Sequence, residues 1–188
     1  DHAASRGAKP YAVYRGGAFC HQSWKQTIPD LRAVRLQTVI TSALQRAGTA
    51  PGEIDLIVPH GAATALSDTY EASCLAAAFE GSRCEAVAAC FKPFFGHLLA
   101  ASGIIDLIGA LLCMKHQAVP GRPGDCRLPT ANGQLENRQS SAALSSARSA
   151  GLPVPVATAF AQRRVDTVLK LSTGFTGHDA AAVFVAPR

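Results

Sequence analysis

Two histidines and a lysine stand where a folded chain could do acid–base or electrostatic chemistry. His60 ends the segment IDLIVPH, an apolar run with the length and composition of a buried strand. Lys92 and His97 directly precede a long apolar run, in FKPFFGHLLAASGIIDLIGALLCMK. Because ligands of open α/β sheets gather where strands end, an imidazole that follows a strand can face a cleft. These three side chains are the first candidates for a functional site.

The surroundings of His97 favour one protonation state. We expect His97 to begin the apolar helix that runs to Lys115. The positive end of the helix dipole and the charge of Lys92 would both favour a neutral ring. A neutral imidazole can donate a hydrogen bond to an oxygen that is becoming negative. The alternatives are a histidine satisfied at a strand end for His60, and a helix cap with a surface lysine for His97 and Lys92.

A third motif, STGFTGHDAAAVF, reads as a glycine turn between two strands, with Phe175 inside the turn. Such turns can present a backbone N–H to a ligand. An ordinary hairpin is the alternative, since glycine pairs at this spacing are common in hairpins.

The elements that must position these residues alternate between helices and short apolar strands. Helical patterns cover residues 31–47, about 68–79 and 97–115; strand patterns cover 11–14, 54–60, 85–90 and two or three segments after 154. Gly48 is a plausible stop for the first helix. This order predicts an α/β fold with a buried, mixed sheet. The central helix is apolar on every side, so we expect part of its cover to come from outside this unit.

Composition restricts the classes of function. The 188 residues fit one domain or one large half of a two-part fold, and 48% are hydrophobic against 16% charged. The net charge of +5 comes largely from scattered arginines without a basic run, so nucleic-acid binding is weakly supported. None of the six cysteines forms a CxxC pair, which favours reduced, cytosolic thiols over a disulfide framework or a zinc site.

Two further segments are interpreted from composition. The stretch from Leu98 to Met114 is shorter than a membrane span needs and contains Ser102 and Asp106, so we expect a core helix. We find no signal-peptide pattern at the start of the sequence. Residues 120–153 are rich in Gly, Pro, Ser and Asn and read as loop and surface decoration.

Taken together, the motifs resemble a known family. HGAAT…D…E, K…GHLLAASG…D and GFTGHDA, in this order, resemble the C-terminal half of a β-ketoacyl synthase (ketosynthase) of the thiolase-like superfamily. RGAKPYAVYRG and AGTAPGEIDLIVPHG add to the resemblance, which covers nearly the whole chain and is weakest over residues 120–153. It implies an acyltransferase that joins a malonyl thioester to an acyl thioester by decarboxylative Claisen condensation, in fatty acid or polyketide synthesis. The substrates would be carried on the phosphopantetheine of an acyl carrier protein or on CoA, with no bound cofactor and no metal.

The resemblance also implies roles for single residues. His60 and His97 would hydrogen-bond the malonyl thioester oxygen and stabilise the enolate left after carbon dioxide departs, and Lys92 would hold the polar network. Phe175 matches a gating phenylalanine whose backbone N–H helps to form an oxyanion hole. Thr64 matches a threonine that touches the phosphopantetheine arm. The matches with a supporting role are Glu71, Asp106, Gly96 and Gly177.

Some positions depart from the family pattern. Ala62 replaces a threonine that would touch the arm, Ala63 and Ala100 replace glycines, and Asp179 replaces an asparagine. We therefore expect an altered grip on the arm.

The nucleophilic cysteine of the family lies in an N-terminal half that this sequence does not contain, and none of the six cysteines matches it. The resemblance thus implies a partner or missing segment that carries the nucleophile, an acyl carrier protein as a second partner, a homo- or hetero-oligomer such as a dimer, and a cytoplasmic location. Two alternatives remain. One is a non-catalytic scaffold or chain-length-determining subunit. The other is an unrelated metalloprotein, for which the ligand spacing is missing.

Overall fold

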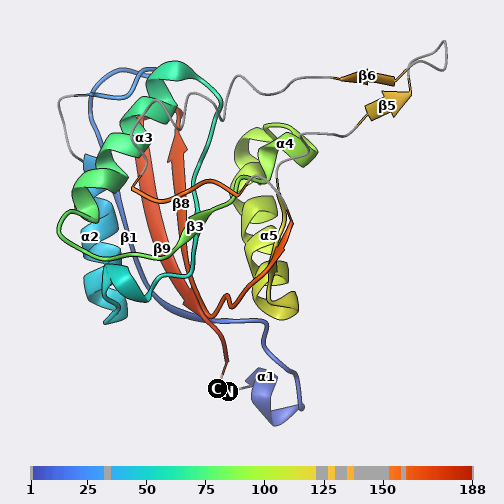
Figure 1. Ribbon diagram of the computed structural model, residues 1–188. Coiled ribbons are helices and arrows are strands. Elements are labelled where there is room, and N and C mark those ends of the chain that lie inside the picture. The colour runs from blue at the N-terminus through green and yellow to red at the C-terminus, as the bar shows by residue number, and fades with distance from the viewer. Residues whose placement is uncertain are drawn as a thin grey trace.

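A five-stranded mixed sheet with helices on both faces organises the chain (Figure 1). The computed structural model describes residues 2–31, 35–121, 127–129, 135–137, 153–157 and 160–187. The elements in chain order are α1 (His2–Ser5), β1 (Val13–His21), α2 (Arg35–Ala47), η1 (Pro51–Glu53), β2 (Leu56–Val58), α3 (Ala65–Ala78), β3 (Val87–Ala88), α4 (Lys92–Phe95), η2 (Leu99–Ala101), α5 (Ser102–His116), β4 (Ala118–Val119), β5 (Arg127–Pro129), β6 (Leu135–Asn137), β7 (Ala161–Gln162), β8 (Thr167–Gly174), η3 (Phe175–Gly177) and β9 (His178–Val185).

The strand order of the sheet is β1-β9-β8-β2-β3. β9 pairs antiparallel with β1 and with β8, whereas β2 is parallel to both β8 and β3. All three residues of β2 are fully buried, as expected for a short apolar strand covered on both faces. The predicted α/β class with a mixed sheet is therefore confirmed.

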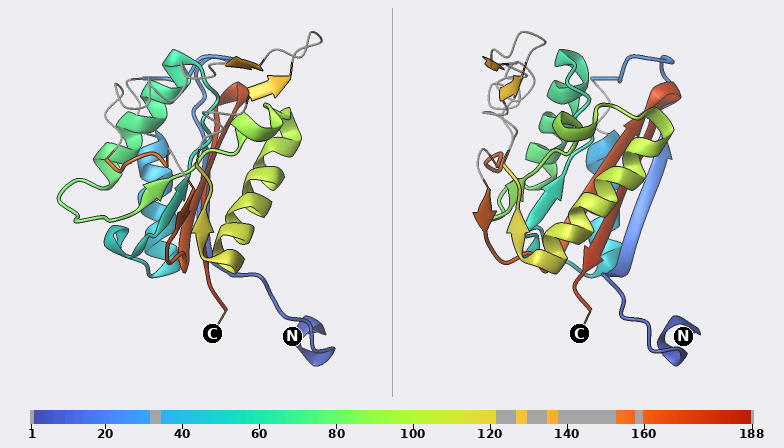
Figure 2. Two further views of the ribbon diagram at one scale, coloured as in Figure 1. Left: turned by 45° about the vertical axis from the view of Figure 1, so that its right-hand side comes forward. Right: turned by 90° about the vertical axis from the view of Figure 1, so that its right-hand side faces the viewer.

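Helices α2 and α3 cover one face of the sheet, and α5 covers the other (Figure 2). α2 is amphipathic and turns a buried stripe to the sheet, formed by Leu36, Val39, Ile40, Ala43, Leu44 and Ala47. It ends at Ala47 and is followed by Gly48, whose φ of +60° lies in the left-handed region that glycine adopts without strain. A second core lies between α5 and the sheet, where Ala110, Cys113 and Met114 pack near Val58 and Val168.

The opposite side of α5 remains apolar but uncovered in this chain. Ile104, Ile108 and Leu112, each one turn from the next, are 61%, 47% and 46% exposed. With η2, the helix spans Leu99–His116, 18 residues of mean hydropathy 1.5. In the described part of the chain it is the one helix that meets the length and composition of a membrane span. The prediction that this segment is too short to cross a membrane is therefore wrong. The structure makes it the central helix of the fold, with Asp106 buried in ion pairs.

Several boundaries differ from the sequence prediction. β1 runs to His21 rather than ending near residue 14, because it pairs along its length with β9. α5 begins at Ser102, after the short helices α4 and η2. His97 was predicted to begin the helix, and that prediction is wrong because His97 lies in the loop between α4 and η2.

The loop-rich segment 120–153 is described only in part. Within it β5 and β6 pair antiparallel, and most of the remainder lies outside the described residues, as does Cys126. The five described cysteines are free thiols, of which Cys74 and Cys113 are buried and Cys20, Cys84 and Cys90 are partly exposed.

Candidate active site

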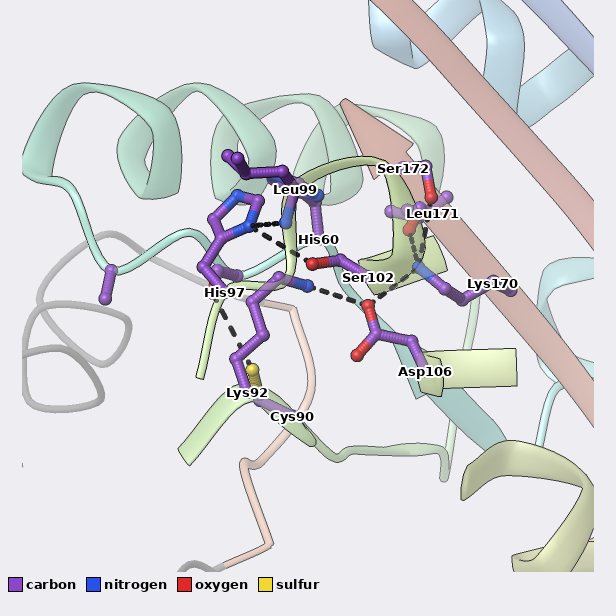
Figure 3. Close-up of polar contacts among 12 residues, drawn as sticks. His60, Cys90, Lys92, His97, Leu99, Ser102, Asp106, Lys170, Leu171 and Ser172 are labelled. Atoms are coloured by element: carbon purple, nitrogen blue, oxygen red, sulfur yellow. Dashed lines mark hydrogen bonds and ion pairs between the residues drawn. The ribbon is translucent and has the colours of Figure 1, made fainter. Parts of the chain in front are cut away.

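The two candidate histidines meet face to edge. His60 follows β2 and is 8% exposed, and His97 lies between α4 and η2 (Figure 3). Their ring centroids are 5.3 Å apart and the ring planes are inclined by 75°. Both rings line a pocket of about 850 Å³, which is also lined by Phe175 and Gly177. The structure thus brings together residues from three separate motifs.

A carboxylate from α3 fixes the backbone at His60. The backbone N–H groups of His60 and Gly61 donate to Glu71 Oε1 and Oε2 at 2.6 and 2.9 Å. Gly61 has a φ of +55°, and a Cβ there would lie 2.7 Å from Cys90 Sγ, so the turn requires glycine on both counts. Burial raises the pKa of Glu71, and the two N–H donors oppose that rise.

The turn continues to Thr64, which occupies the N-cap position of α3 and lines the pocket without a side-chain capping bond. Ala63, where the resemblance led us to expect a glycine, has a φ of +64°, an uncommon conformation for a residue with a side chain. Its N–H donates to Asp68 Oδ1 at 3.2 Å, which helps to hold that conformation.

The ring of His97 is oriented by the residues that follow it. The Leu99 N–H donates to His97 Nδ1 at 3.1 Å, and Ser102 Oγ lies 3.1 Å from the same nitrogen. Since a backbone N–H can only donate, Nδ1 is the unprotonated nitrogen and the ring proton lies on Nε2. Leu99 has a φ of +50° and Gly96 one of +79°, so this loop is bent at two positions to place the ring.

His60 is held neutral by its surroundings. Burial lowers its pKa to about 3, and the positive charges of Lys92 and Lys170 add to the effect. At physiological pH the ring therefore carries one N–H that can be donated to an oxygen in the pocket.

Behind the histidines lies a buried ionic cluster (Figure 3). Lys92 Nζ lies 2.7 Å from Asp106 Oδ2, and Lys170 Nζ lies 3.3 Å from the same oxygen. All three side chains are nearly inaccessible, so Lys92 is not the surface lysine of the alternative interpretation. Lys170 was missed by the sequence analysis. The signal was a lysine inside the apolar strand VLKLS, where a buried charge needs a partner.

The turn that carries Phe175 is attached to the segment after β1. The Thr176 N–H donates to Gln26 O at 2.5 Å, and the Gln22 N–H donates to Gly177 O at 2.8 Å. Gly177 has a φ of +84°, and a Cβ there would lie 3.0 Å from Gln22 Cβ. Phe175 itself is 68% exposed at the edge of the pocket.

Asp179, next to this turn, is almost fully buried. Its Oδ2 accepts from Gln22 Nε2 at 2.7 Å and from the Tyr70 hydroxyl at 2.8 Å. Its Oδ1 has no hydrogen-bond partner among the described residues. Burial raises the pKa of this carboxyl.

No described cysteine has the electrostatics of a nucleophile. Burial raises the pKa of all five thiols, to about 11 for Cys74 and Cys113, and the thiolate is the reactive form. Cys90, which lies beside Gly61, also has a pKa raised by burial. Among the described residues there is no group of three His, Cys, Asp or Glu side chains that could hold a metal ion.

Comparison with known proteins decides the family. The family model described as "Beta-ketoacyl synthase, C-terminal domain" matches residues 11–124, more than half of the chain. The chain belongs to the β-ketoacyl synthase family.

Relatives of this β-ketoacyl synthase chain include 3-oxoacyl-[acyl-carrier-protein] synthase 2 of Coxiella burnetii, which is 27% identical over 97% of this chain and 40% of its own length. The tetracenomycin polyketide synthase ketoacyl synthase alpha subunit of Streptomyces glaucescens is 28% identical over 99% of this chain and 39% of its own length.

A solved structure of a type II PKS acyl-carrier protein in complex with its ketosynthase matches with a TM-score of 0.77, at 26% identity, and covers 100% of this chain and 41% of its own. The fold is thus that of the ketosynthases, with α5 as its central helix. The chain spans about 40% of the length of these two curated relatives.

Proposed function

We propose that this chain supplies the decarboxylation half of a β-ketoacyl synthase active site, with His60, His97 and Lys92 as its functional side chains. The observation that carries the proposal is the pair of imidazoles, 5.3 Å apart in one pocket and backed by a buried lysine. A scaffold that only shapes a cavity has no need of that arrangement.

The chemistry follows from the two neutral rings. When a malonyl thioester loses carbon dioxide, the electron pair of the broken C–C bond moves onto the thioester carbonyl and forms an enolate. The N–H of His60 and the Nε2–H of His97 would donate to that oxygen as it becomes negative. The enolate carbon then attacks the acyl group held on a cysteine thioester, and the cysteine thiolate leaves. Lys92 and Asp106 would act as positioning residues behind the rings.

The cysteine itself is proposed to come from elsewhere, either from a subunit or from an N-terminal part of a longer polypeptide. None of the five described thiols has a lowered pKa, which supports this arrangement. The exposed apolar stripe Ile104, Ile108 and Leu112 on α5 is a suitable surface for that half, in a homo- or hetero-oligomer.

The substrate arm is proposed to be the phosphopantetheine of an acyl carrier protein, or CoA. One structural neighbour is a ketosynthase in complex with its acyl-carrier protein, which supports the first carrier. Thr64 at the pocket wall would contact the arm, Phe175 would gate the pocket, and Gly96 and Gly177 would shape the adjoining turns. Fatty acid synthesis and polyketide synthesis are both candidate pathways, since the relatives include a 3-oxoacyl-[acyl-carrier-protein] synthase and a polyketide ketoacyl synthase. A cytoplasmic location is part of the proposal.

A non-catalytic, chain-length-determining partner is the second candidate. The absence of a suitable thiol among the described residues fits it as well as it fits a divided active site. The two candidates differ in what they require of the histidines, because only the enzyme needs an imidazole N–H in the pocket.

Malonyl-thioester decarboxylation by the assembled protein, with the nucleophile-bearing half present, separates the candidates. The substitutions His60→Ala and His97→Ala should each lower turnover at least about a hundredfold, which is the usual cost of removing a hydrogen-bond donor to an oxyanion. His116→Ala, an exposed histidine at the end of α5, is the matched control and should leave turnover unchanged. Full turnover by both site variants in an intact assembly would refute the enzyme and favour the scaffold.

A further inference from the structure

Gln22 is a buried glutamine in the wall of the pocket. It directly follows β1, is 8% exposed, and lines the pocket together with residues 25–29 of the same segment. An amide buried to this extent needs hydrogen-bond partners, so its contacts indicate what it does. These contacts connect the segment 22–30 with α3 and with the start of β9.

The orientation of the Gln22 amide is fixed by its partners. The Asp30 N–H donates to one end of the amide at 2.9 Å, so that end is the oxygen, Oε1, since a backbone N–H can only donate. The other end is Nε2, which donates to Asp179 Oδ2 at 2.7 Å and to the Tyr70 hydroxyl at 3.1 Å. Both ends of the amide are thus in use.

The Tyr70 hydroxyl completes this set of bonds. Its oxygen accepts from the Leu36 N–H at 3.1 Å as well as from Gln22, so its own proton goes to Asp179 Oδ2 at 2.8 Å. The pattern does not depend on the charge of Asp179, because a proton on that carboxyl would lie on Oδ1, which has no partner among the described residues. Gln22 and Tyr70 therefore share one acceptor at the start of β9.

Two backbone bonds join the segment 22–30 to the turn η3. The Gln22 N–H donates to Gly177 O at 2.8 Å, and the Thr176 N–H donates to Gln26 O at 2.5 Å. The segment and η3 both line the pocket. The side chain of Gln22 adds a third connection through Asp179, which lies two residues after η3. The two parts of the wall are thus bonded to each other at three points.

We propose that Gln22 is a positioning residue whose side-chain amide holds η3 and the segment 22–30 together as one wall of the pocket. Bonds from the segment, from α3 and from β9 all meet at this amide, so its removal should loosen the segment and η3 together. The connection is a property of the folded chain. Only its effect on substrate binding rests on the proposed function.

The test is amide hydrogen exchange of the full protein without substrate, measured by mass spectrometry with fragmentation that resolves single amides. Gln22→Met keeps the length of the side chain and removes its bonds to Asp30, Tyr70 and Asp179. The Thr176 amide donates to Gln26 and not to this side chain. It should nevertheless exchange at least about tenfold faster in the variant, because the loss of these bonds favours local opening. A purely local role of Gln22 would speed exchange only at Asp30.

A double variant reverses the polarity of the same bonds. In Gln22→Glu/Asp179→Asn the new carboxylate would accept from the Asp30 N–H, from the Tyr70 hydroxyl and from the new amide nitrogen. Exchange at Thr176 should therefore stay within about threefold of the unaltered protein. Gln22→Met/Asp179→Asn offers no such bonds and should exchange as fast as Gln22→Met.

Gln45→Met is the matched control, because Gln45 is exposed on α2 and should leave exchange at Thr176 unchanged. In the unaltered protein the amides of Gln22, Asp30 and Thr176 should have protection factors within about threefold of one another, since they open together. Clearly different protection of these amides would overturn the proposal, and this measurement needs no variant to fold. Unchanged exchange at Thr176 in folded Gln22→Met would also overturn it.

Activity is a separate readout. If decarboxylation is present, Gln22→Met should raise the KM for malonyl carried on an acyl carrier protein at least about threefold and leave kcat nearly unchanged, because the histidines keep their own contacts. An unchanged KM in an active protein would overturn the effect on substrate binding. If the exchange rates behave as stated and no decarboxylation is found, the proposed function fails and the connection through Gln22 stands.

Discussion

The neutral state of His60 can be tested through the stability of the fold. Its pKa is about 3 in the folded protein against an ordinary value of 6.5, because burial and nearby positive charge penalise the imidazolium. The unfolded chain therefore binds a proton at this residue in a pH range where the folded chain does not. The stability that the neutral His60 contributes to the fold is therefore fully present above pH 6.5 and is lost as the pH falls toward 3.

The size of the effect follows from the same shift. Between about pH 6.5 and about pH 4.5 the histidine is protonated in the unfolded chain and neutral in the folded one. Each of these roughly two pH units lowers the free energy of unfolding by about 1.36 kcal/mol. His60 should thus lower the free energy of unfolding by about 2–3 kcal/mol between neutral pH and about pH 4.5. His60→Gln keeps a polar side chain that does not titrate in this range, so the variant should lack this part of the acid sensitivity.

The assay is urea unfolding of both proteins at neutral pH and at about pH 4.5. The loss of unfolding free energy on acidification is then compared between the variant and the unaltered protein. Effects of the other five histidines and of the carboxyl groups are common to both proteins and cancel. If His60→Gln and the unaltered protein lose the same free energy on acidification, the folded-state ring titrates normally and the argument for a neutral N–H donor at His60 is wrong.

Three further outcomes are expected. Gly109→Ala should lower the free energy of unfolding by about 1–3 kcal/mol, because its Cβ would lie 2.7 Å from the Phe91 ring. Gly103→Ala on the same helix should not, since its Cβ would meet only Ser172 Oγ, at 3.4 Å. Asp179→Asn should raise stability at alkaline pH by about 1–2 kcal/mol, and the gain should shrink as the pH falls through the raised pKa of Asp179. The thiol of Cys113, with its pKa raised to about 11, should react slowly with iodoacetamide at neutral pH, as measured by mass spectrometry of the folded and unfolded protein.

Each of these three has an opposite result that would contradict it. Equal stabilities for the two glycine variants would mean that Phe91 can move aside at no cost. An Asp179→Asn variant no more stable than the unaltered protein at alkaline pH would mean that the unpartnered Oδ1 is satisfied in solution. Equal labelling of Cys113 in the folded and unfolded states would mean that burial does not protect the thiol.

The sequence predicts well those features that depend on local periodicity. The run that became β2, the amphipathic pattern of α2 and the glycine turn near Phe175 lie where the patterns indicated. The meeting of His60 and His97 was implied by the family resemblance and not by a local pattern, because His97 follows the short helix α4 and not a strand of the sheet.

The features that escaped prediction depend on contacts between distant residues. His97 was expected on a helix N-terminus, but the chain inserts η2 before α5, and the positive φ of Leu99 has no signature in the residue type. The role of Lys170 depends on Asp106, which lies far along the chain on another element. The bonds from Gln22 and Tyr70 to Asp179 likewise join segments that no periodic pattern connects.

The two imidazoles are anchored to different layers of the molecule. Glu71 of α3 ties His60 to the sheet and to the helices behind it, whereas Ser102 ties His97 to the first residue of α5, on the far side. The width of the gap in which an oxygen could be bound is therefore set by how closely α5 approaches the sheet. Gly109 of α5 lies against the ring of Phe91, which is in the segment between β3 and α4, and it allows the helix to approach that segment closely. A side chain at Gly109, about two helical turns from Ser102, would thus be expected to change the spacing of the two rings.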